Sequence, residues 1–361
     1  MNDAELLKLG LGQEEKKELE SDIVTNKKKI NKVLSEARKS SKGEKCLYCG
    51  KETTSFCNSH SIPAFCLRNI ATNGAVFHSN TLVDFPLLDF EKGVNKAGTF
   101  QLICRECDGV IFQEYEEPNN YENEPTPQMI AEIAMKNYLK AISKRVHEHA
   151  IFDKVKEHKF EATGFANYMQ EIQDTDLNEY KKEYEKAKRL SKKNNSGEYY
   201  LFFYEKLNYV VPIAFQSSLS LVVDLDGQIV NDIYYKNPKY RIEDFHICVF
   251  PLKDSSVIMM FVDSNNKRYR NFYKKFNKLT LEDKLSIVNY IIFLYSEDIF
   301  LSKQIPEDIL NDENLKNVSK QTSMALVSNP FGSAIEEAKN VYDLSKHNTI
   351  PNLLSEKCKL R

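Results

Sequence analysis

The chain has 361 residues, 42% of them hydrophobic and 11% aromatic, which is enough for two or three globular domains with cores of their own. Its formal net charge of −2 excludes a uniformly basic nucleic-acid binder, so contact with a polyanion has to come from a local patch. No apolar run reaches the roughly 18 to 20 residues that a membrane span needs, and the first residues contain no secretory signal. We therefore expect a cytoplasmic protein.

Residues 1–43 are predicted to form a charged helical arm with a thin apolar stripe. Between residues 26 and 45, eight basic residues stand against two acidic ones. Such a segment is either a solvated helix face or an arm that contacts phosphates, and the sequence leaves both interpretations open.

Two Cys-x-x-Cys pairs dominate the next segment, residues 44–117. Each pair bends tightly enough for two thiolates to share one ion, and tetrahedral Zn²⁺ needs four ligands, so two pairs complete a closed structural site. Disulfides would need an oxidising compartment, and simple packing of buried thiols does not explain two identical spacings. The predicted zinc ligands are Cys46, Cys49, Cys104 and Cys107.

The second cysteine pair is expected to follow a short strand at residues 98–103, and a helix is expected to begin near Asp108. Residues 116–127 are acidic and rich in Pro and Asn, which indicates a domain boundary. Beyond it, apolar residues recur at helical spacing, so the segment 118–196 is predicted to be a connector followed by helices. The expected helices span about residues 128–158 and 177–193.

From residue 197 the pattern changes to runs of β-branched and aromatic residues, which predicts an antiparallel sheet within an α+β domain at 197–303. Asp226-Gly227 is a strong hairpin-turn signal, because both residues tolerate positive φ. The polar stretch 304–361 is predicted to be a peripheral tail. The expected strands span residues 199–204, 209–215, 219–225, 228–235, 246–252 and 256–262, and helices are expected at 268–279 and 280–302. The fold class is therefore α+β.

The order of the motifs in residues 44–117 resembles the zinc-containing branch of the HNH endonuclease superfamily. Between the two cysteine pairs stands Ser59-His60-Ser61-Ile62-Pro63, in which His60 falls on the family's catalytic histidine and Pro63 on its proline. The family's core is a β-hairpin followed by a helix around one catalytic metal ion, the ββα-metal fold. The resemblance therefore implies a zinc-stapled ββα-metal module between the helical arm and the connector.

The resemblance further implies that His60 is the general base that activates water, while Mg²⁺ or Mn²⁺ stabilises charge on the scissile phosphate. An imidazole accepts a proton near neutral pH, and a metal ion neutralises a developing oxyanion. Asp108, directly after the second cysteine pair, falls where the family has His or Asn. Because a carboxylate is a competent ligand for Mg²⁺ or Mn²⁺, Asp108 is the candidate catalytic metal ligand.

The sequence departs from the family at Ser59, where the family has Asp or His as a metal ligand. Glu116 lies about two turns beyond Asp108 on the expected helix, so it is either an altered ligand or an ordinary surface carboxylate. Cys57-x-x-His60 is a rival zinc pair, and the isolated His78 is a further possible ligand.

The resemblance thus implies a metal-dependent HNH-type endonuclease that hydrolyses DNA, with RNA as the second choice of substrate. Modules of this kind joined to unrelated domains are typical of bacterial restriction and phage-defence effectors, so the C-terminal domain is expected to supply control or targeting. The alternative is a non-catalytic zinc module that binds nucleic acid or a protein. A regulatory protein or a second copy of the chain is a further expected partner, and no membrane contact is expected.

Overall fold

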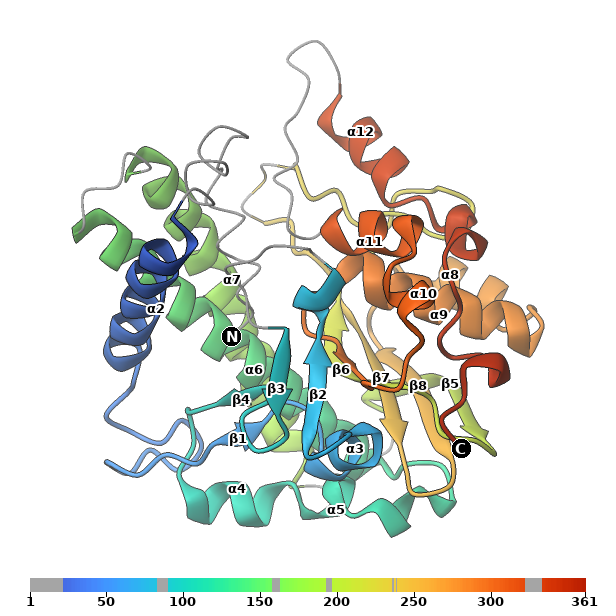
Figure 1. The fold of residues 1–361 in the computed structure, drawn as a ribbon, viewed down its shortest axis with the longest axis horizontal. Coiled ribbons are helices and arrows are strands. Elements are labelled where there is room, and N and C mark those ends of the chain that lie inside the picture. The colour runs from blue at the N-terminus through green and yellow to red at the C-terminus, as the bar shows by residue number, and fades with distance from the viewer. Residues whose placement is uncertain are drawn as a thin grey trace. The chain divides into compact units, whose positions relative to one another are not determined.

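The computed structural model shows an α+β protein in which helices accompany an antiparallel sheet (Figure 1). It falls into two compact units, each described here by itself. Residues 1–21 of the expected helical arm lie outside the described part. The described residues are 22–82, 90–157, 163–192, 197–235, 237, 239–321 and 333–361. Unit 1 comprises Met1–Ser61, Phe85–Asp89 and Gly98–Asn195, and unit 2 comprises Ile62–Asp84, Phe90–Ala97 and Ser196–Arg361.

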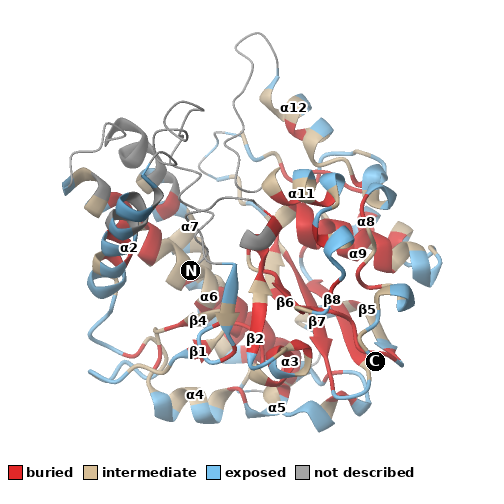
Figure 2. Cartoon of the chain, viewed as in Figure 1, coloured by how far each residue is buried: buried red, intermediate tan, exposed pale blue. Residues whose placement is uncertain are grey.

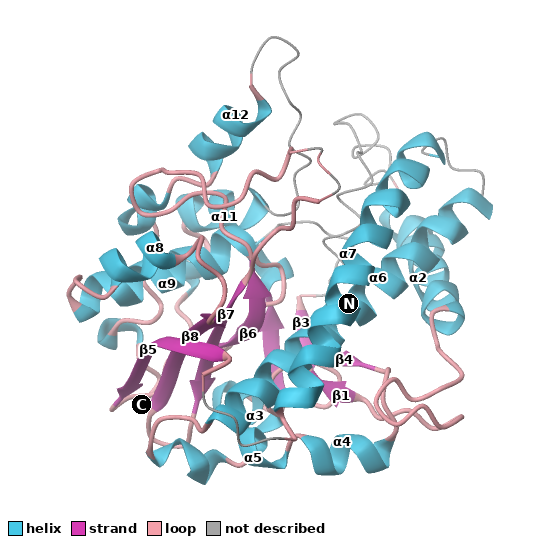
Figure 3. Cartoon of the chain, turned by 180° about the vertical axis from the view of Figure 1, so that it is seen from behind, coloured by secondary structure: helices cyan, strands magenta, loops and turns pink. Residues whose placement is uncertain are grey.

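Three helices form the bulk of unit 1, and Figure 3 shows α6 and α7 lying side by side. The first begins at the N-cap Asp22, whose side chain accepts a hydrogen bond from the Thr25 N–H. Residues 129–139 are all buried, so α6 passes through the core of the unit. The helix predicted at 128–158 is confirmed, whereas the one predicted at 177–193 begins well before residue 177. The bounds are Ile23–Ser40 for α2, Pro127–Glu157 for α6 and Thr163–Leu190 for α7.

A small antiparallel pair of strands followed by a helix completes unit 1. Strand β1 (Ser59–His60) pairs with β4 (Thr99–Phe100), with Ser59 opposite Phe100. Helix α4 (Arg105–Ile111) begins directly after Cys104, three residues before the predicted start at Asp108. A short helix α5 (Gln113–Glu116) and a 3₁₀ turn η3 (Pro118–Glu122) then lead into α6.

Unit 2 is built on a seven-stranded sheet whose neighbouring strands are all antiparallel, in the order β3-β2-β9-β6-β7-β8-β5. Every residue of β7 is buried (Figure 2), and such a continuous apolar strand requires cover on both faces. Helix α3 (Ala64–Ile70) contacts β6 and β7. The strands are β2 Ala75–His78, β3 Glu91–Gly93, β5 Tyr199–Leu207, β6 Ile213–Leu219, β7 Phe245–Pro251, β8 Ser256–Asp263 and β9 Phe300–Leu301.

Two predicted strands, 219–225 and 228–235, are wrong as regular strands. The Asp226-Gly227 turn is present, with Gly227 at φ +71°, but its flanks share a single bridge, between Val223 and Ile229. The Asp224 carboxylate accepts hydrogen bonds from the backbone N–H groups of Asp226 and Gln228. Side-chain bonds of this kind satisfy the backbone locally and compete with a strand ladder.

The C-terminal part of unit 2 also departs from the prediction. Helix α9 (Leu281–Tyr295) ends seven residues before the expected limit, and β9 follows it within the sheet. The predicted peripheral tail 304–361 is wrong for part of its length, because the polar stretch contains apolar side chains that join the core of unit 2. These are Ile305, Leu310, Leu315, Leu344, Ile350, Leu353 and Leu354. The remaining helices are α8 Arg270–Phe276, α10 Glu307–Leu310, α11 Glu313–Lys320 and α12 Ala334–Val341.

The expected module at 44–117 is divided between the two units, because the segment between β1 and β4 contributes β2 and β3 to the sheet of unit 2. Both cysteine pairs, His60 and Asp108 remain together in unit 1. None of the described helices is long and apolar enough to cross a membrane.

Candidate functional site

The four predicted cysteines come together in unit 1. The first pair lies in a tight turn, in which the Gly50 N–H donates to the Cys46 carbonyl at 2.8 Å and Gly50 takes φ +72°. The second pair brackets the start of α4, and the Cys104 N–H donates to the Cys46 sulfur at 3.3 Å. The two local turns thus bring the two thiols of each pair toward a common point between the pairs.

The geometry and chemistry of this cluster fit a structural zinc ion. The Sγ atoms of Cys46, Cys49, Cys104 and Cys107 all lie within 4.8 Å of one another, and thiolates around tetrahedral zinc lie about 3.8 Å apart. In the described part of the chain this is the one group of three or more Cys, His, Asp or Glu residues with metal-binding spacing. The rival pair formed by Cys57 and His60 is not part of it.

Two of the thiols differ in acidity. Burial raises the pKa of Cys46, but hydrogen bonds from the backbone of Cys49 and Cys104 outweigh it and bring that pKa down to about 7. Burial, together with hydrogen bonding to the neighbouring thiols, raises the pKa of Cys107. Without an ion Cys107 therefore keeps its proton, which zinc binding has to displace.

Helix α7 supports the first cysteine turn. Lys188 donates from Nζ to the Tyr48 carbonyl at 2.8 Å, and its Nζ lies 4.9 Å from the centre of the Tyr48 ring. The Tyr184 hydroxyl reaches the neighbouring Leu47 carbonyl at 3.5 Å. The turn therefore rests on a helix of the same unit as well as on the cysteine cluster.

His60 lies on β1, where it pairs with Thr99 of β4. The pairing continues on both sides, because the Ser61 N–H donates to the Gly98 carbonyl and the Cys57 N–H donates to the Ile103 carbonyl. His60 is half-buried, whereas the preceding Ser59 is fully buried. Since successive strand residues are directed to opposite faces, Ser59 and His60 present their side chains to different sides of β1.

The side chain that reaches Asp108 is Ser59. The Ser59 hydroxyl donates to Oδ1 of Asp108 at 2.5 Å, and the Cys57 thiol donates to Oδ2 at 3.2 Å. The structure therefore brings together Ser59 and Asp108, the two positions that correspond to metal ligands in the HNH resemblance.

A buried lysine lies between these two residues. Lys136 of α6 has a side chain with no exposed surface, and its Nζ is 2.9 Å from the Ser59 hydroxyl, 3.3 Å from Asp108 Oδ1 and 3.1 Å from Glu116 Oε1. Its Nζ also lies 3.6 Å from the centre of the Phe112 ring, a distance at which a cation interacts with the ring face. One ammonium group thus joins β1, α4, α5 and α6.

The charge of this lysine controls Asp108. Burial raises the pKa of Asp108, but the Lys136 charge and hydrogen bonds from Ser59 and Cys57 outweigh it and hold the pKa below its usual range. Asp108 is therefore ionised at neutral pH, and both of its carboxylate oxygens already have donors. In this arrangement Asp108 and Glu116 do not fit a divalent ion, because the ammonium fills the space between their oxygens.

A second buried carboxylate lies one turn earlier on α6. The Glu132 side chain accepts hydrogen bonds from the Tyr115 N–H at 3.1 Å and from the Gln128 amide at 2.9 Å. Burial raises the pKa of Glu132 to about 7. The sequence interpretation missed both Glu132 and Lys136, although a signal was present: two charged residues in an otherwise apolar stretch of a helix.

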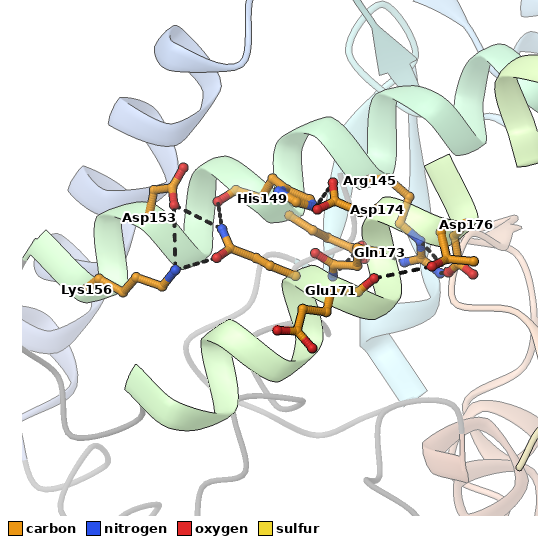
Figure 4. A network of polar contacts seen from close by, with 11 residues as sticks. Arg145, His149, Asp153, Lys156, Glu171, Gln173, Asp174 and Asp176 are labelled. Atoms are coloured by element: carbon orange, nitrogen blue, oxygen red, sulfur yellow. Dashed lines mark hydrogen bonds and ion pairs between the residues drawn. The ribbon is translucent and has the colours of Figure 1, made fainter. Parts of the chain in front are cut away.

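A separate polar network lies further along α6 and α7 (Figure 4). Arg145 pairs with Glu148 at 2.5 Å and with Asp176 at 2.9 Å, and the Gln173 amide donates to Glu148 at 3.0 Å. Asp176 and Gln173 lie on α7, so the network joins the two helices. Because α6 also carries Lys136, the network supports the position of the buried ammonium.

His78, the other possible ligand suggested by the sequence, is buried in unit 2. Its Nε2 lies 3.8 Å from Asp298, and its ring packs edge-on against Phe300. It has a structural environment within the sheet of that unit.

In comparisons with known proteins, no family model, no curated protein and no solved structure matches this chain.

Proposed function

We propose that this protein is a nuclease that hydrolyses phosphodiester bonds of DNA, with RNA as the second choice of substrate. The observation that carries the proposal is the order β1, β4, α4 in unit 1, a pair of antiparallel strands followed by a helix, with His60 on the first strand. The four-cysteine cluster brackets the same elements. The HNH resemblance implies a hairpin followed by a helix, and the strand pair followed by α4 supports the proposal, although the segment that joins β1 to β4 contributes strands to unit 2.

In this proposal His60 is the general base. Imidazole is the side chain that most often serves as a general base, and the strand pairing with Thr99 keeps the half-buried His60 in one place. Zinc would be bound by the four cysteines. It would fix the position of α4 relative to β4 and would take no part in the chemistry.

The resemblance also implies a divalent metal ion at Asp108. Mg²⁺ or Mn²⁺ at Asp108 would stabilise charge on the phosphate, but Ser59, Cys57 and Lys136 already engage both oxygens of Asp108. A comparison of cutting with and without added Mg²⁺ tests whether a metal ion takes part.

The test is cleavage of supercoiled plasmid, single-stranded DNA and RNA by the zinc-loaded full chain, with Mg²⁺, with Mn²⁺ and with neither. His60→Ala should abolish cutting while zinc content and unfolding temperature stay unchanged. His149→Ala is the matched control, because His149 lies on α6 and pairs with Asp174. Cutting by the His60→Ala protein at the wild-type rate would refute the role of His60.

A specific observation, the pairing of Lys136 with two carboxylates, supports a second candidate function. A non-catalytic module that binds nucleic acid or a protein needs no metal, and Lys136 neutralises the carboxylates that would otherwise bind one. Such a module would cut none of the three substrates, and a mobility-shift assay with His60→Ala would show at most a modest loss of affinity.

The setting is proposed by analogy alone: a bacterial restriction or phage-defence effector in which unit 2 supplies control or targeting. Unit 2 has a hydrophobic core of its own around the seven-stranded sheet. A regulatory protein or a second copy of the chain is its expected partner. Light scattering of the purified chain would show whether it forms a dimer.

A further inference from the structure

The Lys136 ammonium is surrounded as a bound cation would be. Its three N–H donors face three oxygens, on Ser59, Asp108 and Glu116, at 2.9 to 3.3 Å. An ammonium group has three donors, so this set satisfies it completely. The Phe112 ring covers a further side at 3.6 Å. Nothing in this environment requires an additional ion.

The distances suit an ammonium and do not suit a metal ion. Oxygen ligands lie about 2.0–2.1 Å from Mg²⁺, well inside the observed separations from Nζ. A divalent ion could reach Asp108 and Glu116 only after the ammonium had moved away. Lys136 lies in a helical segment that is buried throughout residues 129–139, so moving it would expose charge and core together.

We infer that Lys136 is a built-in cation that takes the place of the catalytic divalent metal ion at Asp108. This inference rests on the proposed function, because it names the cation of the same site. Lys136 acts as a positioning residue: it holds Ser59 and Asp108 together, and its three donors are all engaged. The chain therefore takes up zinc at its cysteines and no divalent ion at Asp108.

The experiment measures Mn²⁺ binding by electron paramagnetic resonance to the zinc-loaded full chain, in the absence of nucleic acid. Five proteins are compared: wild type, Asp108→Asn, Lys136→Met, Lys136→Met with Asp108→Asn, and the control Lys188→Met. Lys188 is a matched control, because its ammonium also meets a carbonyl and an aromatic ring in unit 1. Zinc content and circular dichroism check folding, and Lys136→Gln replaces Lys136→Met where the latter does not fold.

We expect wild type and Lys188→Met to show only weak Mn²⁺ binding that Asp108→Asn does not alter. Lys136→Met should bind one Mn²⁺ at least tenfold more tightly than wild type, and the added Asp108→Asn change should remove this gain. Wild-type binding that Asp108→Asn abolishes would overturn the inference, since it would mean that a metal displaces the lysine. Equal binding by wild type and by the folded Lys136 variants would overturn it too, since the lysine would then only join helices.

The nuclease proposal and this inference are tested independently, so either can be refuted without the other. Mn²⁺ binding is measured without substrate, so a protein that cuts nothing still tests Lys136. Conversely, cutting that needs His60 and added Mg²⁺ would support the nuclease proposal and contradict the built-in cation.

Discussion

Replacement of one cysteine in the four-cysteine cluster should destabilise unit 1. Cys46 and Cys104 are 58 residues apart in the chain, so an ion that joins them closes a long loop. The chain-entropy relation for a cross-link of that length gives about 4 kcal/mol. Because domains are usually stable by only about 5–15 kcal/mol, Cys104→Ser should remove a large fraction of the stability of this unit.

Two measurements check this expectation. Elemental analysis should find one zinc per wild-type chain and none bound tightly by Cys104→Ser. Urea unfolding followed by circular dichroism should show a midpoint shift equivalent to about 4 kcal/mol. Cys358→Ser is the control, because this half-buried thiol lies in unit 2, outside the cluster. It should keep both the zinc and the unfolding midpoint of unit 1.

The reasoning would be refuted by a Cys104→Ser protein that retains one zinc and unfolds like wild type. It would fail equally if wild-type protein purified under reducing conditions contained no zinc and gained no stability from it. In either case the close approach of the four sulfur atoms would have to be explained by packing alone.

Arg145→Met leaves two carboxylates without their cation and should lower the free energy of unfolding by about 3–5 kcal/mol in urea; a loss below about 1 kcal/mol would contradict the network in Figure 4. In a double-mutant cycle, Lys136→Met and Asp108→Asn should be coupled by about 2 kcal/mol, and additive effects would argue against the ion pair. Burial lowers the pKa of His246 to about 3, below its unfolded value of about 6.5. The unfolded state then binds the proton first, so stability is lost as the pH falls below about 6.5, by up to about 1.4 kcal/mol per pH unit. His246→Phe should flatten that decline between pH 7 and 5, and an unchanged slope would count against a buried neutral histidine.

Several elements could be predicted from the sequence because their signals are local. The two Cys-x-x-Cys spacings identify the cysteine cluster, since each pair needs only one turn to bring two thiols together. The helical spacing of apolar residues predicts α6, and the β-branched and aromatic runs predict β5, β7 and β8. In each case a few neighbouring residues contain the whole pattern.

Other features depend on partners that are distant in the chain. Strand β9 has two residues and is a strand only because β2 and β6 flank it, so its own sequence has no strand signal. The runs at 219–225 and 228–235 have suitable composition but share only one bridge, and the Asp224 side chain accepts hydrogen bonds from the backbone of the turn between them. Composition alone cannot choose between these outcomes.

The candidate site likewise has one part that the sequence predicts and one part that only the tertiary structure decides. The sequence by itself determined the four cysteines, their spacing and the position of His60 between the pairs. Only the tertiary structure placed Lys136 against Ser59 and Asp108, across 77 and 28 residues of chain. Helical spacing and composition report on neighbours within a few residues, whereas the electrostatics of Asp108 are set by an ammonium that the packing of α6 buries beside it.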